Sequence, residues 1–198
     1  MHYKIIVFDF DGTLINSNEI KLIAYYKAFS SVELDKSIID DILKEFPELN
    51  RYDTIGKIIL ASNNSSINQD EIIFRYNKIV MTDIIKATPL EYAEKILVEL
   101  KKRELKLYLS SNTPLEILSE IINAKNWRFY FKDIYGYPSE KSETIKKIIK
   151  ENKFSKDKYL VVGDGESDKI SASSNNIDFF KVKEKSLKDL AVFLRIEV

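Results

Sequence analysis

Residues 3–13, YKIIVFDFDGT, join a short apolar run to an acidic turn near the start of the chain. Residues 3–8 are mostly β-branched or aromatic, which is typical of a strand that is buried on both faces of a sheet. Asp9, Asp11 and Gly12 then place two carboxylates and a tight turn directly after that strand. The stretch therefore predicts a buried strand that opens into a polar loop at its carboxyl end.

Similar apolar runs recur later in the chain, with helical patterns between them. The strand-like runs are 105–109, 158–162, 177–182 and a weaker one at 133–135, and the helical patterns are 90–103, 115–124, 142–152, 168–174 and 187–194. Pro89 and Pro114 stand where a first helical residue tolerates proline, which supports two of the helix starts. The alternation predicts an α/β fold, a Rossmann-like doubly wound parallel sheet with helices on both faces.

The segment 16–87 differs from the rest because it contains no strand-like run and carries apolar residues at helical spacing. Its pattern is interrupted near 46–47 and 63–66, which indicates about four helices. We therefore expect a helical cap domain at residues 16–87, inserted into an α/β core formed by residues 1–15 and 88–198.

Composition excludes several classes of function. The chain has 31 Lys+Arg and 31 Asp+Glu, so no net field attracts nucleic acid or acidic lipid. It has no cysteine, which excludes thiolate catalysis and cysteine-bound metals. Its single histidine, His2, stands at the terminus, so we expect neither a histidine-based triad nor a multi-histidine metal site. There is no apolar run of membrane-spanning length and no signal-peptide pattern. We expect a cytoplasmic protein, a monomer or homodimer, that binds neither nucleic acid nor membrane.

The polar residues that follow the predicted strands point to one site. In a doubly wound sheet the carboxyl ends of the strands meet at one edge, where ligands bind. The side chains expected there are Asp9, Asp11, Ser111, Asn112, Lys141, Asp164 and Asp168. Clustered carboxylates need a cation to stay ionised, and oxygen-only ligands favour Mg²⁺. A metal, a lysine and a helix N-terminus together favour a phosphate group.

The same residues indicate a chemistry. A carboxylate beside a metal-bound phosphoryl group can attack phosphorus and form an aspartyl phosphate. A second carboxylate two residues further on can protonate the leaving oxygen and later deprotonate water.

Four short motifs, in this order, resemble those of the haloacid dehalogenase (HAD) superfamily: DFDGTL at 9–14, SSN at 110–112, Lys141, and GDGESD at 163–168. The helical insertion resembles the α-helical cap of subfamily I, which includes phosphoglycolate phosphatase and β-phosphoglucomutase. Asn16 departs from the pattern, since relatives often carry aspartate there, and we expect it to affect cap hinging rather than chemistry.

The resemblance implies a role for each motif residue. Asp9 would be the nucleophile and a metal ligand, and Asp11 the general acid and base, with its carbonyl on the metal. Asp164 would bind Mg²⁺ directly, and Asp168 would complete the metal site by orienting metal waters or Lys141. Ser111 and Lys141 would bind the phosphoryl group, with Ser110 as the alternative to Ser111. Further substrate-binding candidates are Gly12, Thr13, Asn112 and, in the cap, Arg51.

These roles predict a Mg²⁺-dependent phosphatase of a small phosphorylated metabolite, similar to phosphoglycolate or a sugar phosphate. The alternatives are a phosphomutase, a phosphonatase and a non-catalytic phosphate-binding or regulatory protein. Against a phosphomutase, the cap histidine of that type would fall near Lys21. A phosphonatase needs a cap lysine, for which Lys57 is a candidate.

Overall fold

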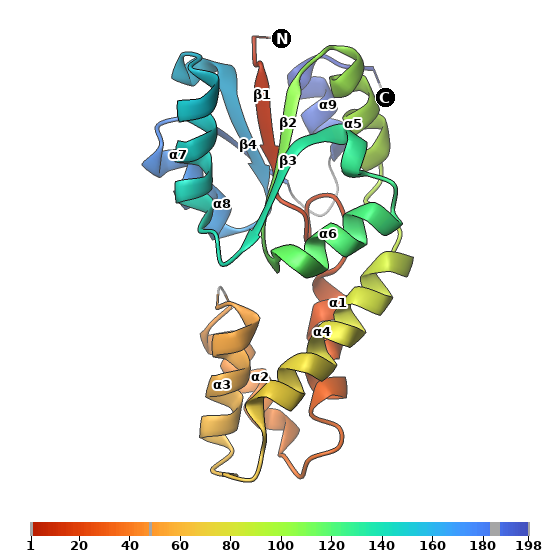
Figure 1. Cartoon of the computed structure of the whole chain (residues 1–198), viewed down its shortest axis with the longest axis vertical. Helices are drawn as coiled ribbons and strands as arrows, with labels where there is room; N and C mark the ends of the chain where they lie inside the picture. The colour runs from red at the N-terminus through yellow and green to blue at the C-terminus, as the bar shows by residue number, and fades with distance from the viewer. Residues whose placement is uncertain (1, 48, 183–186, 198) are drawn as a thin grey trace. The chain divides into compact units, whose positions relative to one another are not determined.

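A computed structural model describes residues 2–47, 49–182 and 187–197 and divides the chain into two compact units (Figure 1). The core unit comprises Met1–Ser17 and Ala87–Val198, and the helical unit comprises Asn18–Lys86. The helical unit is thus inserted between two parts of the core unit in the sequence.

The described part of the core unit contains a five-stranded parallel sheet in the order β3-β2-β1-β4-β5. The strands are β1 (Ile5–Phe8), β2 (Lys106–Pro114), β3 (Phe131–Tyr137), β4 (Tyr159–Gly163) and β5 (Asp178–Lys181). The first strand of the chain is the central one, because Ile5 pairs with Lys106 of β2 and with Tyr159 of β4. All four residues of β1 are buried, as predicted from their apolar run.

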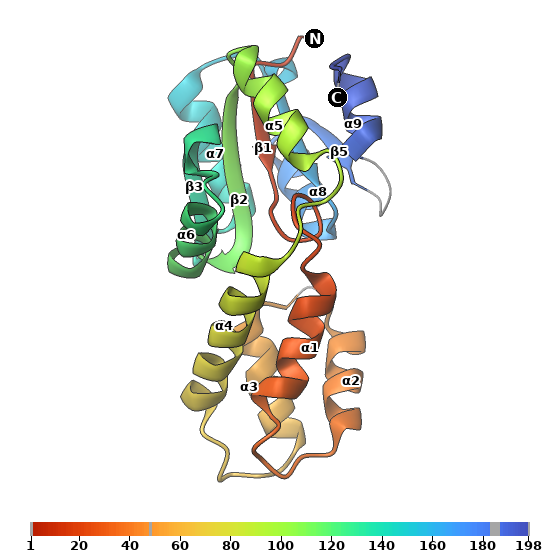
Figure 2. The same cartoon turned by 90° about the vertical axis from the view of Figure 1, so that its right-hand side faces the viewer.

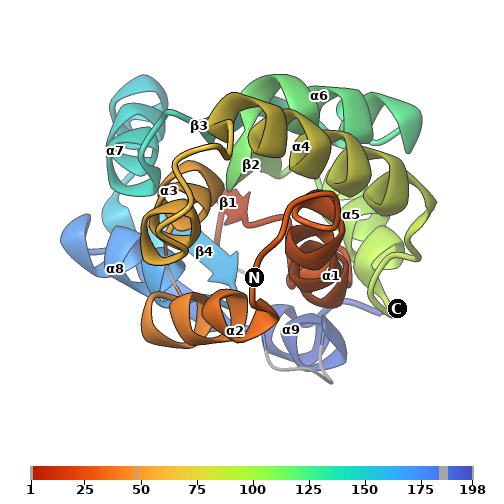
Figure 3. The same ribbon diagram turned by 90° about the horizontal axis from the view of Figure 1, so that it is seen from below.

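Helices cover both faces of this sheet, and Figure 1 and Figure 3 show the two groups on opposite sides. One group contains α5 (Ala93–Lys102), α6 (Leu115–Ala124) and α9 (Leu187–Leu194), and the other contains α7 (Lys141–Asn152) and α8 (Glu166–Ser174). Ile5 and Val7 pack in one cluster with Ile145 and Ile148 of α7. The expected Rossmann-like, doubly wound fold is therefore confirmed.

The expected helix start at Pro89 is wrong. Pro89 pairs with Ile15 in an isolated antiparallel bridge, and the Leu90 backbone N–H donates to the Leu14 carbonyl at 2.9 Å. This pairing keeps the backbone extended, and Tyr92 then adopts a left-handed conformation with φ of 71°. Helix α5 therefore begins only at Ala93.

The helical unit consists, over its described residues, of α1 (Asn18–Ala28), α2 (Lys36–Glu45), α3 (Arg51–Ala61) and α4 (Gln69–Lys86), all visible in Figure 2. Helix α1 packs on α4, and α3 packs on both α2 and α4. Side chains of Asp35 and Asn50 cap the N-termini of α2 and α3 by accepting bonds from backbone N–H groups. No helix in the described ranges of the chain is both long and apolar enough to span a membrane.

Candidate active site

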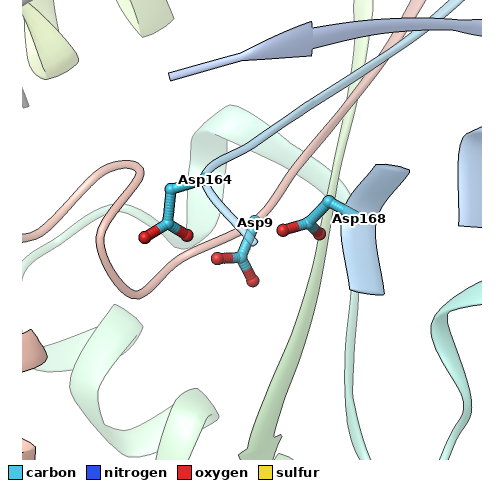
Figure 4. A group of neighbouring side chains, drawn as sticks. All are labelled: Asp9, Asp164 and Asp168. Atoms are coloured by element: carbon cyan, nitrogen blue, oxygen red, sulfur yellow. The ribbon is translucent and has the colours of Figure 1, made fainter. Parts of the chain in front are cut away.

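Three aspartates meet at the carboxyl edge of the sheet (Figure 4). Asp9 directly follows β1, Asp164 follows β4, and Asp168 lies in the first turn of α8. Each offers a carboxylate oxygen, and these oxygens lie within 4.8 Å of one another. Oxygen donors at this spacing fit a hard divalent cation such as Mg²⁺.

Lys141 joins two of these carboxylates. It is the first residue of α7, and its Nζ donates to Asp9 Oδ1 at 2.8 Å and to Asp168 Oδ1 at 2.7 Å. The three side chains are only 7%, 6% and 3% exposed, respectively. Charge-assisted bonds of this kind, shielded from water, hold both carboxylates in fixed positions.

The ionisation of the site reflects its excess of negative charge. Burial raises the pKa of Asp9; Lys141 opposes the shift, while the nearby Asp11 and Asp164 add to it. Burial and the charge of Asp9 likewise raise the pKa of Asp168 to about 7. Burial disfavours the charged form of Lys141, but Asp9 and Asp168 outweigh this and raise its pKa above the usual range. One ammonium does not balance this group of carboxylates, which is a further reason why a cation fits there.

The absence of a side chain at Gly163 lets Asp168 reach the end of β4. A Cβ at Gly163 would lie 2.2 Å from Asp168 Cγ, far inside contact distance. The Asp168 carboxylate also accepts a bond from the Gly165 backbone N–H at 3.3 Å. At the other acidic turn, Gly12 has a φ of 74°, a conformation that favours glycine.

The Asp11 side chain is bound to hydroxyl groups. Its Oδ1 accepts from Ser17 Oγ at 2.6 Å. Its Oδ2 accepts from Ser111 Oγ at 3.2 Å and from Thr113 Oγ1 at 2.8 Å. Hydroxyl donors thus hold both oxygens of the Asp11 carboxylate.

An irregularity in β2 brings Ser111 and Thr113 to the same carboxylate. The pairing of β2 with β3 shifts between Ser110 and Pro114, so the residues between them leave the regular ladder. Ser111 and Thr113 are two residues apart and both buried, whereas Asn112 between them is exposed. Of the two adjacent serines, Ser111 donates to Asp11.

Thr13 is placed among the carboxylates. Its side chain is fully buried, and Oγ1 lies 3.4 Å from Asp9 Oδ2 and 3.5 Å from Asp164 Oδ1, both at the long end of hydrogen bonding. The Thr13 hydroxyl therefore contacts the carboxylates of both acidic loops.

Arg51 and Lys57 belong to the helical unit. Arg51 is 6% exposed, its Nη1 donates to Asn77 Oδ1 at 2.7 Å, and its guanidinium lies 5.2 Å from the centre of the Tyr76 ring. The ammonium of Lys57 lies 4.0 Å from the centre of the Phe46 ring. Both cations thus have contacts inside their own unit.

Sequence reasoning missed Ser17 and Thr113, which both donate to Asp11. Thr113 had a signal, because in extended backbone the residue two positions after Ser111 faces the same side. Ser17 had none beyond its nearness to the acidic turn.

Comparison with protein families gives one match over most of the chain. The sequence model of a family described as haloacid dehalogenase-like hydrolase matches residues 6–182. No curated protein matches the chain.

Solved structures with the same fold cover nearly the whole chain. A candidate phosphatase from Clostridium difficile has 24% identity and a TM-score of 0.71, over 93% of this chain and 86% of its own. A candidate HAD-hydrolase, YfnB from Bacillus subtilis, was solved with magnesium and has 16% identity and a TM-score of 0.77, over 99% and 100%. A CbbY variant from Rhodobacter sphaeroides, in complex with xylulose-1,5-bisphosphate, has 14% identity and a TM-score of 0.72, over 92% and 88%. At these identities the likeness establishes the fold.

Proposed function

The chain belongs to the haloacid dehalogenase-like hydrolases, and on this premise we propose that it is a Mg²⁺-dependent phosphatase of a small phosphorylated metabolite. The observation that carries the proposal is the buried Lys141 ammonium held between Asp9 and Asp168, with Asp164 beside them. A fixed cation next to a carboxylate nucleophile stabilises the charge that develops during phosphoryl transfer to an aspartate.

The metal would be held by Asp9 and Asp164, with the Asp11 carbonyl and Asp168 completing its surroundings. Bound Mg²⁺ supplies positive charge that offsets the charge of the phosphoryl oxygens. The structure of YfnB with magnesium supports this choice of ion.

The residues of this chain then have distinct tasks. Lys141 and Ser111 bind the phosphoryl oxygens. An Asp9 oxygen forms a bond to phosphorus as the ester P–O bond breaks, and protonated Asp11 gives its proton to the leaving oxygen. Asp11 next accepts a proton from water, whose oxygen attacks phosphorus; phosphate leaves and the Asp9 carboxylate is restored.

The ligands of similar structures indicate the substrate class. The CbbY structures hold phosphate and xylulose-1,5-bisphosphate, which favours compounds similar to sugar phosphates or phosphoglycolate. We propose that the helical unit acts as the cap that selects among them, with Arg51 as a candidate contact. Arg51 already donates to Asn77, so in this role other N–H groups of its guanidinium would donate to the substrate.

The proposal is tested by phosphate release from an aryl phosphate and a panel of sugar, glycolate and nucleoside phosphates, with Mg²⁺ or with chelator. We expect turnover that needs the metal and that Asp9→Asn abolishes. The matched control, Asp157→Asn, changes an exposed aspartate and should leave turnover intact. If folded, Mg²⁺-loaded protein released no phosphate from any compound of the panel, the proposal of a phosphatase would be refuted. Phosphoryl transfer between two sugar positions without phosphate release would instead identify a mutase.

A further inference from the structure

We propose that Thr113 is a positioning residue that holds the Asp11 carboxylate in place while Ser111 is engaged with the phosphoryl group. The inference rests on the proposed function, because it concerns the proton transfer assigned there to Asp11. Thr113 itself lies directly after the SSN motif at 110–112 and outside all four motifs.

The contact between Thr113 and Asp11 is short and buried. Thr113 Oγ1 lies 2.8 Å from Asp11 Oδ2, and the Thr113 side chain is fully buried. A hydroxyl that donates to a carboxylate makes a charge-assisted bond, which is stronger than a bond between neutral groups. Thr113 therefore fixes one oxygen of Asp11, while Ser17 donates to the other.

Ser111 cannot donate to Asp11 and to a phosphoryl oxygen at the same time, which explains why Thr113 is needed beside it. A serine hydroxyl carries a single proton to donate. Once the Ser111 proton points to a phosphoryl oxygen, it no longer points to Asp11 Oδ2, to which its distance is already the longer one, 3.2 Å. Thr113 still donates to that oxygen, so it continues to hold Asp11 when substrate is bound.

The backbone around Thr113 keeps its hydroxyl in position. The Thr113 N–H donates to Ser111 Oγ at 3.0 Å, and regular pairing with β3 resumes at Pro114 with Tyr137. Gly136 of β3 packs closely against this segment, since a Cβ there would lie 2.5 Å from the Thr113 carbonyl oxygen. Thr113 therefore has little freedom to move away from Asp11.

A positioning role has a consequence that depends on the leaving group. An alkyl alkoxide leaves poorly and needs its proton as the ester bond breaks, whereas a nitrophenolate leaves without one. Poor placement of Asp11 should therefore slow alkyl esters and spare aryl esters. A loss of folding or of phosphate binding would slow both kinds of substrate alike.

The test compares Thr113→Val with the wild type on p-nitrophenyl phosphate and on the best alkyl phosphate of the panel. Valine keeps the shape of threonine and the backbone N–H to Ser111, and it removes only the hydroxyl. We expect kcat for the alkyl ester to fall about 10- to 100-fold, with a change below about threefold for the aryl ester. Thr113→Ser, which keeps the donor, should restore the alkyl rate.

Thr144→Val is the matched control. Thr144 is also buried, and its Oγ1 has no hydrogen-bond partner among the described residues, so its loss should leave both rates unchanged. Equal losses on the two esters in Thr113→Val, or no loss on the alkyl ester, would overturn the inference alone. A wild type without turnover of any phosphate ester would overturn the proposed function and this inference with it.

Discussion

Replacing Gly163 with alanine tests how the site is built, because the new methyl group would occupy space that Asp168 now fills. The added Cβ would lie 2.2 Å from Asp168 Cγ and 2.4 Å from its Oδ2, whereas carbon atoms in contact are about 3.5–4.0 Å apart. Asp168 would have to move by more than about 1 Å and so lose its 2.7 Å bond to Lys141.

The size of the effect follows from these two changes. Overpacking costs about 1–3 kcal/mol, and a hydrogen bond to a charged group is worth about 1.5–3 kcal/mol. We expect the free energy of unfolding to fall by about 3–5 kcal/mol, which lowers Tm by about 6–20 °C in a chain of this size. Because Lys141 also loses one of its two carboxylate partners, phosphate release should fall by about 100-fold or more.

The measurements are thermal or urea unfolding followed by circular dichroism, together with the phosphate-release assay. Gly56→Ala provides the matched control, because its Cβ would meet Gln69 at an ordinary 3.5 Å. Alanine within α3 should raise stability by about 0.5–1 kcal/mol and leave turnover unchanged. A Gly163→Ala protein with wild-type Tm and wild-type turnover would refute the close approach of Asp168 as the reason for glycine.

Three further outcomes are expected. Mg²⁺ at about 100 times its Kd should raise Tm by about 5–11 °C in a thermal-shift assay, and Asp164→Ala should remove most of this gain. An equal gain in the variant would contradict Asp164 as a ligand of Mg²⁺. Lys141→Met leaves two buried carboxylates without their ammonium, so urea unfolding should show a loss of about 3–5 kcal/mol, and unchanged stability would count against the buried ion pairs. Gly136→Ala would place a Cβ 2.5 Å from the Thr113 carbonyl oxygen and 2.6 Å from Leu115 Cα. Because backbone atoms move little, we expect the free energy of unfolding in urea to fall by about 1–3 kcal/mol. An unchanged free energy of unfolding would show that this segment is free to shift.

The sheet was predictable because its central strands are continuous apolar runs. Burial on both faces selects such runs, and β1 with β4 shows them clearly. The start of α5 was not predictable, since local sequence favours a helix after Pro89 while the bridge between Ile15 and Pro89 holds that segment extended. Pairing between residues so distant in sequence leaves no local trace.

The candidate site also contains residues that could be predicted from the sequence and residues that could not. The carboxylates stand next to recognisable strands and glycines, so Asp9 and Asp164 could be placed at one edge from the sequence. Ser111 could be placed there as well, because it belongs to a motif at the end of a predicted strand. The bonds of Ser17 and Thr113 to Asp11 could not be placed, because serine and threonine are common in loops and the pairing of β2 with β3 is irregular at Thr113. Only the structure shows that Ser17 and Thr113 share one carboxylate with Ser111.

The central place of β1 in the sheet also sets an order of events during synthesis. Ile5 is made before its neighbours in the sheet, Lys106 and Tyr159, which follow about 100 and 150 residues later. The helices that pack on one another in the helical unit all lie between residues 18 and 86, so their partners emerge together. A nascent chain can therefore make these helical contacts while the apolar segment Ile5–Phe8 still lacks both flanking strands. During that interval this apolar segment has no strand to pair with, and a chaperone can bind it.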